Sequence, residues 1–112
     1  MKALSVRQPW ADKILRGEKT IEVRTWTTRY RGPILICASA KKCNDLPTGI
    51  SICVAQLVDI RPIAKNDESA ACCEVDPIRE FAWILTDIRP VDPVPIKGKL
   101  GLFEAPDCAL SG

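Results

Sequence analysis

Short apolar runs, separated by turns that contain glycine or proline, organise this chain. A strand is predicted at 2–6, followed by a short helix at 9–16, where apolar residues recur at helical spacing and Pro9 suits the first turn. A second short helix is predicted at 66–73, because Asn and acidic residues at its start suit an N-terminus. Further strands are predicted at 20–26, 34–38, 50–60, 81–88 and 100–104.

The stretch 20–26 alternates between apolar and polar residues with a period of two. Ile21 and Val23 are expected on one face of a strand. The opposite face carries Thr20, Glu22, Arg24 and Trp26. Spacing alone is typical of a solvated sheet face with a Glu22–Arg24 pair that contributes well under about 1 kcal/mol. A tryptophan on this face instead favours a binding site, because large exposed aromatic residues often gather at sites.

These elements predict a single domain of the α+β class. About six strands and two or three short helices are expected, and the strands follow one another too closely for regular βαβ crossovers. A small mixed, mainly antiparallel β-barrel fits this order, because closure removes exposed sheet edges. Residues 41–47 are expected to form a loop or a single helical turn. Prolines at 90, 93 and 95 predict an extended connection before the last strand.

Length and composition fit one small globular protein. The chain has 112 residues, of which 46% are hydrophobic and 27% charged, and this is ordinary globular composition. It contains no run of about eighteen apolar residues and no signal-peptide pattern at its N-terminus. A soluble, cytoplasmic protein with no membrane partner is therefore predicted, and nothing in the sequence requires more than a monomer.

The net charge of +2 hides an uneven distribution of charge. Residues 1–50 hold ten Lys and Arg against four Asp and Glu, a net +6, whereas residues 51–112 hold six against ten, a net −4. Such a split favours a basic face that binds a polyanion such as nucleic acid.

Six cysteines and the absence of histidine restrict the chemistry of the chain. Cys37 and Cys53 lie in apolar runs, Cys43 and Cys108 lie in turn-like segments, and no CxxC pair occurs. We therefore expect free thiols in a reducing compartment, used as small buried hydrophobes. No metal and no cofactor is predicted, because a zinc site would need four suitably spaced thiolates or help from carboxylates. Without histidine, catalysis would depend on Lys, Thr, Ser, Glu, Asp or Cys.

Two clusters outside the predicted strand at 20–26 add candidate ligand contacts. Arg7 and Gln8 combine a guanidinium with a carboxamide, which can recognise phosphate or a base edge, although RQPW with Trp10 is also typical of a helix entry. A basic and aromatic cluster that would follow a nucleic-acid backbone and stack a base consists of Arg29, Tyr30 and Arg31.

Five segments together resemble the ASCH domain (activating signal cointegrator homology) family of the PUA-like superfamily: SVRQPWA, GEKTIEVRTW, TRYRGPILICAS, FAWIL and KGKLGLFE. The resemblance covers residues 3–104 of the single domain 1–112, and the GxKxxExR motif is filled by Gly17, Lys19, Glu22 and Arg24. It implies a PUA-like β-barrel with a helix-lined cleft. Lys19, Glu22 and Arg24 would line that cleft, whereas Ile21 and Val23 would face the barrel.

The resemblance implies an RNA-binding module as the first hypothesis, with RNA or a nucleotide-like ligand as partner and DNA as the alternative nucleic acid. Phosphate would be contacted by Arg7, Lys19, Arg29 and Arg31. Gln8 and Glu22 would read a base or nucleotide edge, and Trp26 or Tyr30 would stack on it. The predicted set of ligand-binding residues is completed by Trp10, Arg24 and Ser39.

A small hydrolase is the second hypothesis, because some relatives look enzymatic. In those resembling the acetylcytidine amidohydrolases, a threonine lies three residues after the motif lysine, but here Glu22 holds that place and Thr20 directly follows Lys19. The more distant glutamate of those relatives would be supplied by Glu74 or Glu68. A ribonuclease that uses Lys19 with Ser39 or Tyr30 is another form of this hypothesis. Lys19 and Glu22 are the candidate catalytic residues in either form. The third hypothesis is a protein-interaction domain whose basic face is incidental.

Overall fold

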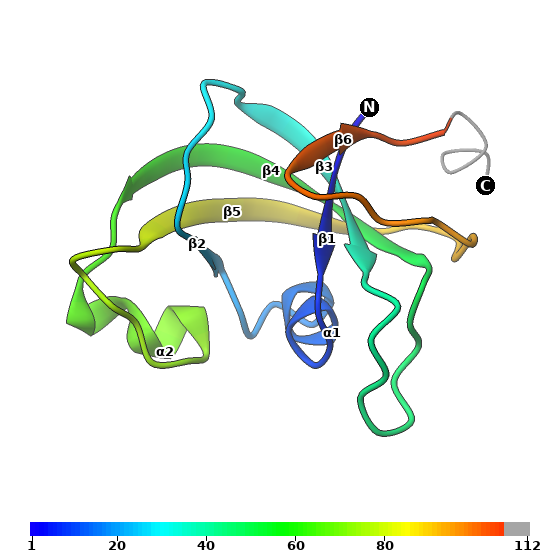
Figure 1. The fold of residues 1–112 in the computed structure, drawn as a ribbon, viewed down its shortest axis with the longest axis horizontal. Coiled ribbons are helices and arrows are strands. Elements are labelled where there is room, and N and C mark those ends of the chain that lie inside the picture. Colours follow the sequence, from blue (N-terminus) through cyan, green and yellow to red (C-terminus); the bar gives the residue numbers. More distant parts are fainter. Residues whose placement is uncertain (107–112) are drawn as a thin grey trace.

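The structure of the chain, a computed structural model, describes residues 1–106 (Figure 1). Its strands are β1 (Lys2–Val6), β2 (Ile21–Arg24), β3 (Gly32–Ala38), β4 (Ser51–Pro62), β5 (Phe81–Pro90) and β6 (Leu102–Glu104). Its helices are α1 (Trp10–Leu15), the 3-10 turn η1 (Lys65–Asp67) and α2 (Glu68–Ala71). Neither α-helix among residues 1–106 has the length or the apolar character needed to span a bilayer. Cys108 lies outside the described residues.

The strands form one mixed sheet in the order β2-β5-β4-β3-β1-β6, which curls into a half-barrel (Figure 1). β1 runs parallel to β3, and the other neighbouring strands of this sheet pair antiparallel. The predicted α+β class with a mainly antiparallel sheet is thus confirmed. β2 and β6 are the outer strands, so the sheet ends at them instead of closing into a complete barrel.

The main core lies beneath the arch of β4 and β5, where α1 packs against the sheet (Figure 1). Alternate strand residues point into it, which is the period-two pattern expected of a sheet. Its buried side chains include Leu4, Ile34, Ile36, Leu57 and Trp83 from the strands and Ala11 and Ile14 from α1. The Trp83 side chain is fully buried, and its indole N–H donates to the Trp26 carbonyl oxygen at 3.2 Å.

Two smaller clusters cover the opposite face of the sheet. One contains Leu35, Cys37, Ile96 and Phe103. The other lies beneath α2 and contains Ile21, Ile63, Ala71, Val75 and Ala82. The connection at 91–96 contributes to the first of these clusters and runs without helix, as its prolines predict.

β2 differs from the prediction in the face that it turns to the main core. Its register places Glu22 opposite Trp83 and Ile21 opposite Ile84, and directly opposed residues point to the same face of a sheet. Glu22 therefore lies on the side of the main core, whereas Ile21 and Val23 pack against the cluster beneath α2. The expectation that Ile21 and Val23 face the barrel is wrong, because α2 supplies a separate apolar surface for them.

The limits of several elements differ from those that the sequence pattern predicts. Residues 41–47 form a loop, and the helix predicted at 66–73 is divided into η1 and α2. α2 ends at Ala71, and the following Cys72 has a φ of 59°, which lies in the left-handed region. β2 ends at Arg24, so Trp26 lies beyond the strand and packs edge-to-face on Trp83, with ring centroids 4.7 Å apart.

Candidate ligand-binding cleft

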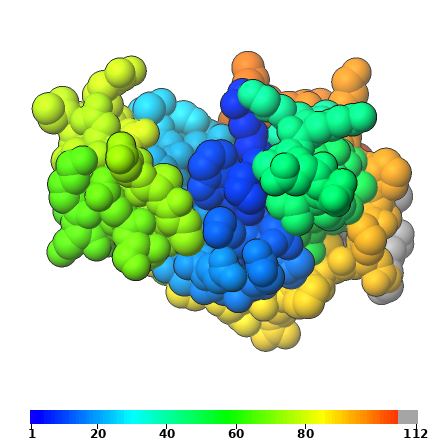
Figure 2. Space-filling model, turned by 90° about the horizontal axis from the view of Figure 1, so that it is seen from below, coloured from blue at the N-terminus to red at the C-terminus, as the bar shows by residue number. Residues whose placement is uncertain are grey.

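A cavity of about 800 Å³ lies between β1, β2, the segment after α2 and the segment before β6. This volume is within the ~300–1,000 Å³ typical of small-molecule sites. Its lining comes from five parts of the chain, at 5–10, 19–24, 39–40, 73–80 and 96–101. In Figure 2 the green and yellow-green residues around α2 stand apart from the teal and orange segments, and blue N-terminal residues lie between them. We call this cavity the cleft.

Three charged side chains form connected ion pairs in the cleft, and we call Lys19, Glu22 and Arg24 the cleft floor. Lys19 Nζ lies 3.6 Å from Glu22 Oε1, and Arg24 Nη2 lies 2.8 Å from Glu22 Oε2. Arg24 Nε also donates to Glu22 Oε2, at 2.9 Å. The side chains of Lys19 and Glu22 are only 2% and 8% exposed, so each depends on its partners to compensate its charge.

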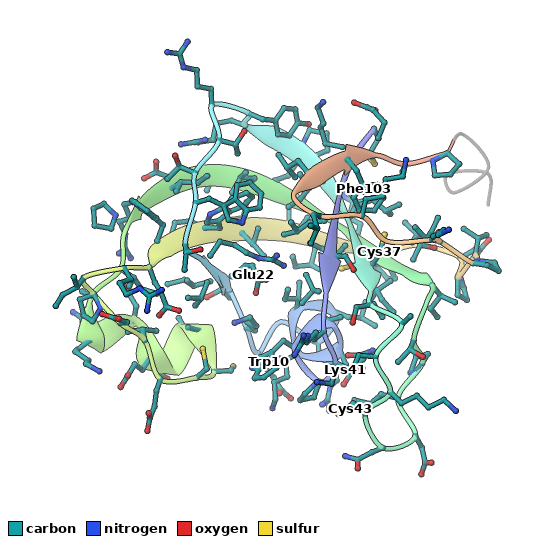
Figure 3. All side chains as sticks on the ribbon, viewed as in Figure 1. Trp10, Glu22, Cys37, Lys41, Cys43 and Phe103 are labelled. Carbon is teal, nitrogen blue, oxygen red and sulfur yellow. The ribbon has the colours of Figure 1, made fainter. Side chains whose placement is uncertain are left out.

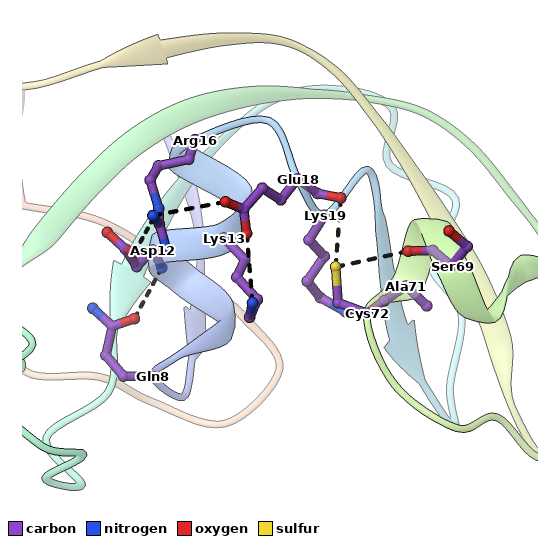
Figure 4. Close-up of polar contacts among 9 residues, drawn as sticks. All are labelled: Gln8, Asp12, Lys13, Arg16, Glu18, Lys19, Ser69, Ala71 and Cys72. Carbon is purple, nitrogen blue, oxygen red and sulfur yellow. Dashed lines mark hydrogen bonds and ion pairs between the residues drawn. The ribbon is translucent and has the colours of Figure 1, made fainter.

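Both cations of the cleft floor also donate to backbone carbonyls of neighbouring elements. Lys19 Nζ donates to the Ala71 carbonyl at the end of α2 (Figure 4), and Arg24 Nη2 donates to the Ser5 carbonyl in β1 at 2.8 Å. The Cys72 thiol adds a second link beside Lys19, because it donates to the Glu18 carbonyl at 3.4 Å. The floor therefore ties β2 to α2 on one side and to β1 on the other, which fixes the geometry of its polar atoms.

The local sequence explains how the floor residues reach this position. α1 ends at Leu15, and Gly17 takes a φ of 77°, which glycine adopts without strain. This turn brings Lys19 beside the end of α2. The alternation of β2 then places Glu22 and Arg24 on the same face, and Figure 3 shows Glu22 in the space between β2 and β1.

Charged residues around the cleft floor divide by sign between two sides of β2. Lys97 and Lys99 belong to the orange segment before β6, on the right of β2 in Figure 1, and Arg7 follows β1. All three are exposed, and within residues 1–106 no ion pair or side-chain hydrogen bond engages them. Glu74 and Glu80 belong to the segment after α2, on the left of β2. The cleft thus has a basic side and an acidic side.

The basic side is held against β1 by Gly98. A Cβ at this position would lie 2.8 Å from the Ser5 Oγ and 3.2 Å from the Ser5 Cβ, so the close approach of the two segments needs glycine. Leu100 in the same segment lines the cleft and is 99% exposed. The lining of the cleft therefore includes one fully exposed apolar side chain beside the basic residues.

Uncharged side chains complete the wall. Trp10 is half-buried at the start of α1 (Figure 3), and Ser39 Oγ has no hydrogen-bond partner among the described residues. Burial raises the pKa of the Cys73 thiol above its ordinary value, with a smaller opposing effect from Lys19. Cys73 is therefore a protonated thiol at neutral pH and a poor nucleophile. Among residues 1–106, no group of three or more His, Cys, Asp or Glu side chains is placed to hold a metal ion.

The structure brings together six of the residues predicted from the sequence: Arg7, Trp10, Lys19, Glu22, Arg24 and Ser39. Five others lie outside the lining: Gln8, Trp26, Arg29, Tyr30 and Arg31. Gln8 is buried and links two segments, because its Nε2 donates to the Pro47 carbonyl and its Oε1 accepts the Asp12 N–H, both at 2.9 Å (Figure 4). Tyr30 donates its hydroxyl to the Pro33 carbonyl, and Trp26 packs on Trp83.

The sequence pattern does not predict that the segments at 73–80 and 97–101 form two walls of the cleft, its acidic side and its basic side. Glu74, one of two choices for the distant glutamate of the enzymatic hypothesis, lies on the acidic side. Neither segment has the hydrophobic period of a strand or helix, so the pattern gives no face to assign. The available signal was the run KGKLG, in which two lysines alternate with two glycines. Glycines of this kind permit a close backbone approach, as Gly98 shows.

A curled, mainly antiparallel half-barrel with short helices defines the chain as an α+β domain, and its cleft lies between β1 and β2. The sequence model of the ASCH domain matches residues 4–95. Because this match spans most of the chain, the protein belongs to the ASCH domain family.

Two relatives and two solved structures give the extent of the likeness. Activating signal cointegrator 1 from Homo sapiens is 54% identical over 39 residues, and that from Mus musculus is 46% identical over 39 residues. Each match covers 35% of this chain but only 7% of the relative. A crystal structure of ASCH from Zymomonas mobilis has a TM-score of 0.67 at 22% identity, covering 84% of this chain and 72% of that one. A mutant of that protein has a TM-score of 0.62 at 20% identity, covering 84% and 74%. These structures share the fold.

Proposed function

We propose that this chain is an RNA-binding module whose cleft takes a nucleotide of a single RNA strand. The observation that carries the proposal is a cavity of nucleotide-compatible size, in which three exposed cations, Arg7, Lys97 and Lys99, have no ion-pair partner among residues 1–106 and lie beside a fixed polar floor. Cations that contact phosphate supply most of the affinity for nucleic acid. Sequence-specific RNA recognition favours single strands, whose bases can leave the stack and enter such a cavity.

Each part of the cleft would have a separate role. Arg7 would contact phosphate, and Trp10 would supply an aromatic surface for a base, since base stacking contributes ~1–3 kcal/mol per base. The floor residues Lys19, Glu22 and Arg24 already compensate one another's charge. They would therefore act as donors and acceptors of fixed geometry, which read the edge of a base, and contribute little to attraction at long range.

The test is fluorescence anisotropy with a labelled single-stranded oligoribonucleotide over a range of salt concentrations. We expect affinity to fall as salt rises, with a slope of about −0.7 for each phosphate contact. Arg7→Ala should weaken binding and flatten the slope by about one contact. The matched control is Arg89→Ala, which removes an exposed arginine on β5 outside the cleft lining.

A salt-independent affinity, or equal effects of Arg7→Ala and Arg89→Ala, would contradict RNA binding in the cleft. A DNA strand of the same sequence, measured in parallel, decides between the two nucleic acids, because the 2′-hydroxyl is the group that distinguishes them. Mass spectrometry of the recovered RNA separates binding from hydrolysis. Product formation that disappears in Lys19→Arg would favour the enzymatic hypothesis instead.

A further inference from the structure

We propose that the cleft holds its nucleotide in one orientation, with the phosphate against Arg7, Lys97 and Lys99 and the N–H groups of the base towards Glu74 and Glu80. This inference rests on the proposed function and adds the polarity of the ligand. The two groups of side chains line one cavity. The segments that carry them, 97–101 and 73–80, lie on opposite sides of β2 in Figure 1.

The basic side is suited to a phosphate because its cations are free and its backbone is fixed. No ion pair or side-chain hydrogen bond within residues 1–106 engages Arg7, Lys97 or Lys99. Gly98 lies between the two lysines and packs directly on Ser5 of β1, so the lysine backbones are held at the edge of the cleft. Arginine and lysine together offer the charge-assisted donors that phosphate recognition uses.

Leu100 gives the basic side a second kind of contact. Its side chain is 99% exposed and lines the cavity. A sugar placed between a phosphate and a base would present its carbon atoms to this side chain. Burial of Leu100 by a bound ligand would stabilise the complex, because removal of apolar surface from water is favourable.

The acidic side is suited to N–H donors because its carboxylates retain acceptor capacity. Glu80 uses Oε1 to accept the Asp76 N–H, at 2.6 Å, while Glu74 is exposed. The segment that carries them is held in place, since Val75 donates its N–H to Glu68 and its carbonyl accepts a hydrogen bond from Lys65. An ionised carboxylate accepts hydrogen bonds only, so this side attracts the amino or imino edge of a base.

The floor between the two sides does not oppose this arrangement. Lys19 and Arg24 are paired with Glu22, so the unpaired charge of the cleft lies at its two sides. A nucleotide has its phosphate at one end and the N–H groups of its base at the other. The reverse orientation would place the phosphate against Glu74 and Glu80, and such like-charge contact is unfavourable.

The experiment tests the phosphate end and the base end of the nucleotide separately. Three kinds of probe are titrated into the protein and their affinities measured by NMR: ribose 5-phosphate, the common ribonucleosides and their 5′-monophosphates. The double variant Lys97→Ala/Lys99→Ala should bind ribose 5-phosphate and the monophosphates about tenfold more weakly, as expected for lost charged hydrogen bonds. Its affinity for the nucleosides should be unchanged. The matched control is Lys41→Ala/Lys42→Ala. It removes two exposed lysines of the 41–47 loop, neither of which lines the cleft; Figure 3 labels Lys41.

Glu74→Gln/Glu80→Gln should have the opposite pattern. This variant should bind the nucleosides and monophosphates about threefold more weakly or worse, since neutral hydrogen bonds are weaker than charge-assisted ones. Its affinity for ribose 5-phosphate should be equal to that of the wild type or higher. The matched control is Glu18→Gln/Glu104→Gln, which changes two exposed carboxylates outside the lining.

The proposed orientation of the nucleotide is overturned if the lysine variant loses equal affinity for nucleosides and for monophosphates. It is likewise overturned if the glutamate variant loses affinity for ribose 5-phosphate. It is also overturned if the oligoribonucleotide binds while none of the three probes shifts the signals of cleft residues. A different result, in which neither the oligoribonucleotide nor any probe binds, counts against the proposed function itself. The two failures are therefore distinguishable.

Discussion

Glu22 is the residue on which the geometry of the cleft depends. It is buried on the face of β2 that turns to the main core, and it pairs with both Lys19 and Arg24. Its position in the strand is predictable from the alternation of the sequence, whereas its burial is not, because an exposed pair two residues apart has the same pattern. The hydrogen bonds that Lys19 and Arg24 donate to Ala71 and Ser5 explain why these charges are kept inside.

Glu22→Gln is expected to destabilise the fold strongly. Removal of one partner leaves the buried Lys19 and the partly buried Arg24 without compensation, which costs ~3–5 kcal/mol. Urea denaturation gives the free energy of unfolding. The same substitution at Glu18, whose pairs with Lys13 and Arg16 are exposed, should cost less than about 1 kcal/mol. Equal losses in the two variants would show that the cleft floor is not a buried ion network.

The connection between β4 and α2 is organised by one carboxylate. Asp67 accepts hydrogen bonds from Arg61 at 2.8 and 2.9 Å and from the Ala64 N–H at 2.8 Å. The Arg61 hydrogen bonds, followed by that of Ala64, lower the pKa of Asp67 to about 2. This contact turns the chain from the end of β4 into α2, which carries the acidic side of the cleft behind it.

Asp67→Asn should destabilise the protein in a pH-dependent manner. Because the folded pKa lies below the ordinary value of 3.8, the ionised Asp67 stabilises the fold above that value, and this stabilisation is lost as pH falls towards about 2. At neutral pH we expect a loss of about 1 kcal/mol, since Arg61 is 43% exposed and solvent screens the pair. The difference between wild type and variant should disappear near pH 2. A difference that is constant with pH in urea denaturation would contradict this assignment, and Asp45→Asn in an exposed loop is the control.

Charges on the folded molecule are distributed differently from charges along the sequence. The basic first half suggested one basic face, but the basic side of the cleft combines Arg7 with Lys97 and Lys99 from the acidic half. The curl of the sheet brings these distant segments together at its outer strands. Charge counted along the chain therefore predicted a basic face, and could not indicate which residues form the basic side of the cleft.

Two core thiols should report global unfolding of the molecule. Burial raises the pKa of Cys37 to about 11 and that of Cys53 to about 12, the latter also through Cys37. Because the thiolate is the reactive form, we expect neither residue to be alkylated in the native protein at mildly alkaline pH. Residue-specific mass spectrometry should show both reacting together as urea unfolds the chain, whereas the partly exposed Cys43 reacts before unfolding. Native labelling of Cys37 or Cys53 would contradict their burial.

Several structural features could be read directly from the chain. The period of apolar residues predicts the strands, and Pro9 with the apolar spacing after it predicts the first helix. Gly17 marks the turn that leads to Lys19 and β2, and an apolar context predicts the buried thiols. Each of these signals acts over a few residues. Trp26 shows the limit of this reasoning. Its alternation placed it on the ligand face, but β2 ends at Arg24, and Trp26 instead packs on Trp83 far along the chain. Gln8 is similar, because its amide serves the Pro47 and Asp12 backbone.

The sequence was sufficient for the α+β class, for a polar strand at Lys19, Glu22 and Arg24, and for the ASCH family, because each depends on local pattern or on a motif of fixed spacing. The tertiary structure decided which face of β2 is the inner one, and that Lys19 and Glu22 are buried and paired. It also decided that residues 73–80 and 97–101 form the two sides of the cleft. These outcomes depend on strand register and on the curl of the sheet. They bring together residues that are distant in the chain, and no local pattern records such a contact.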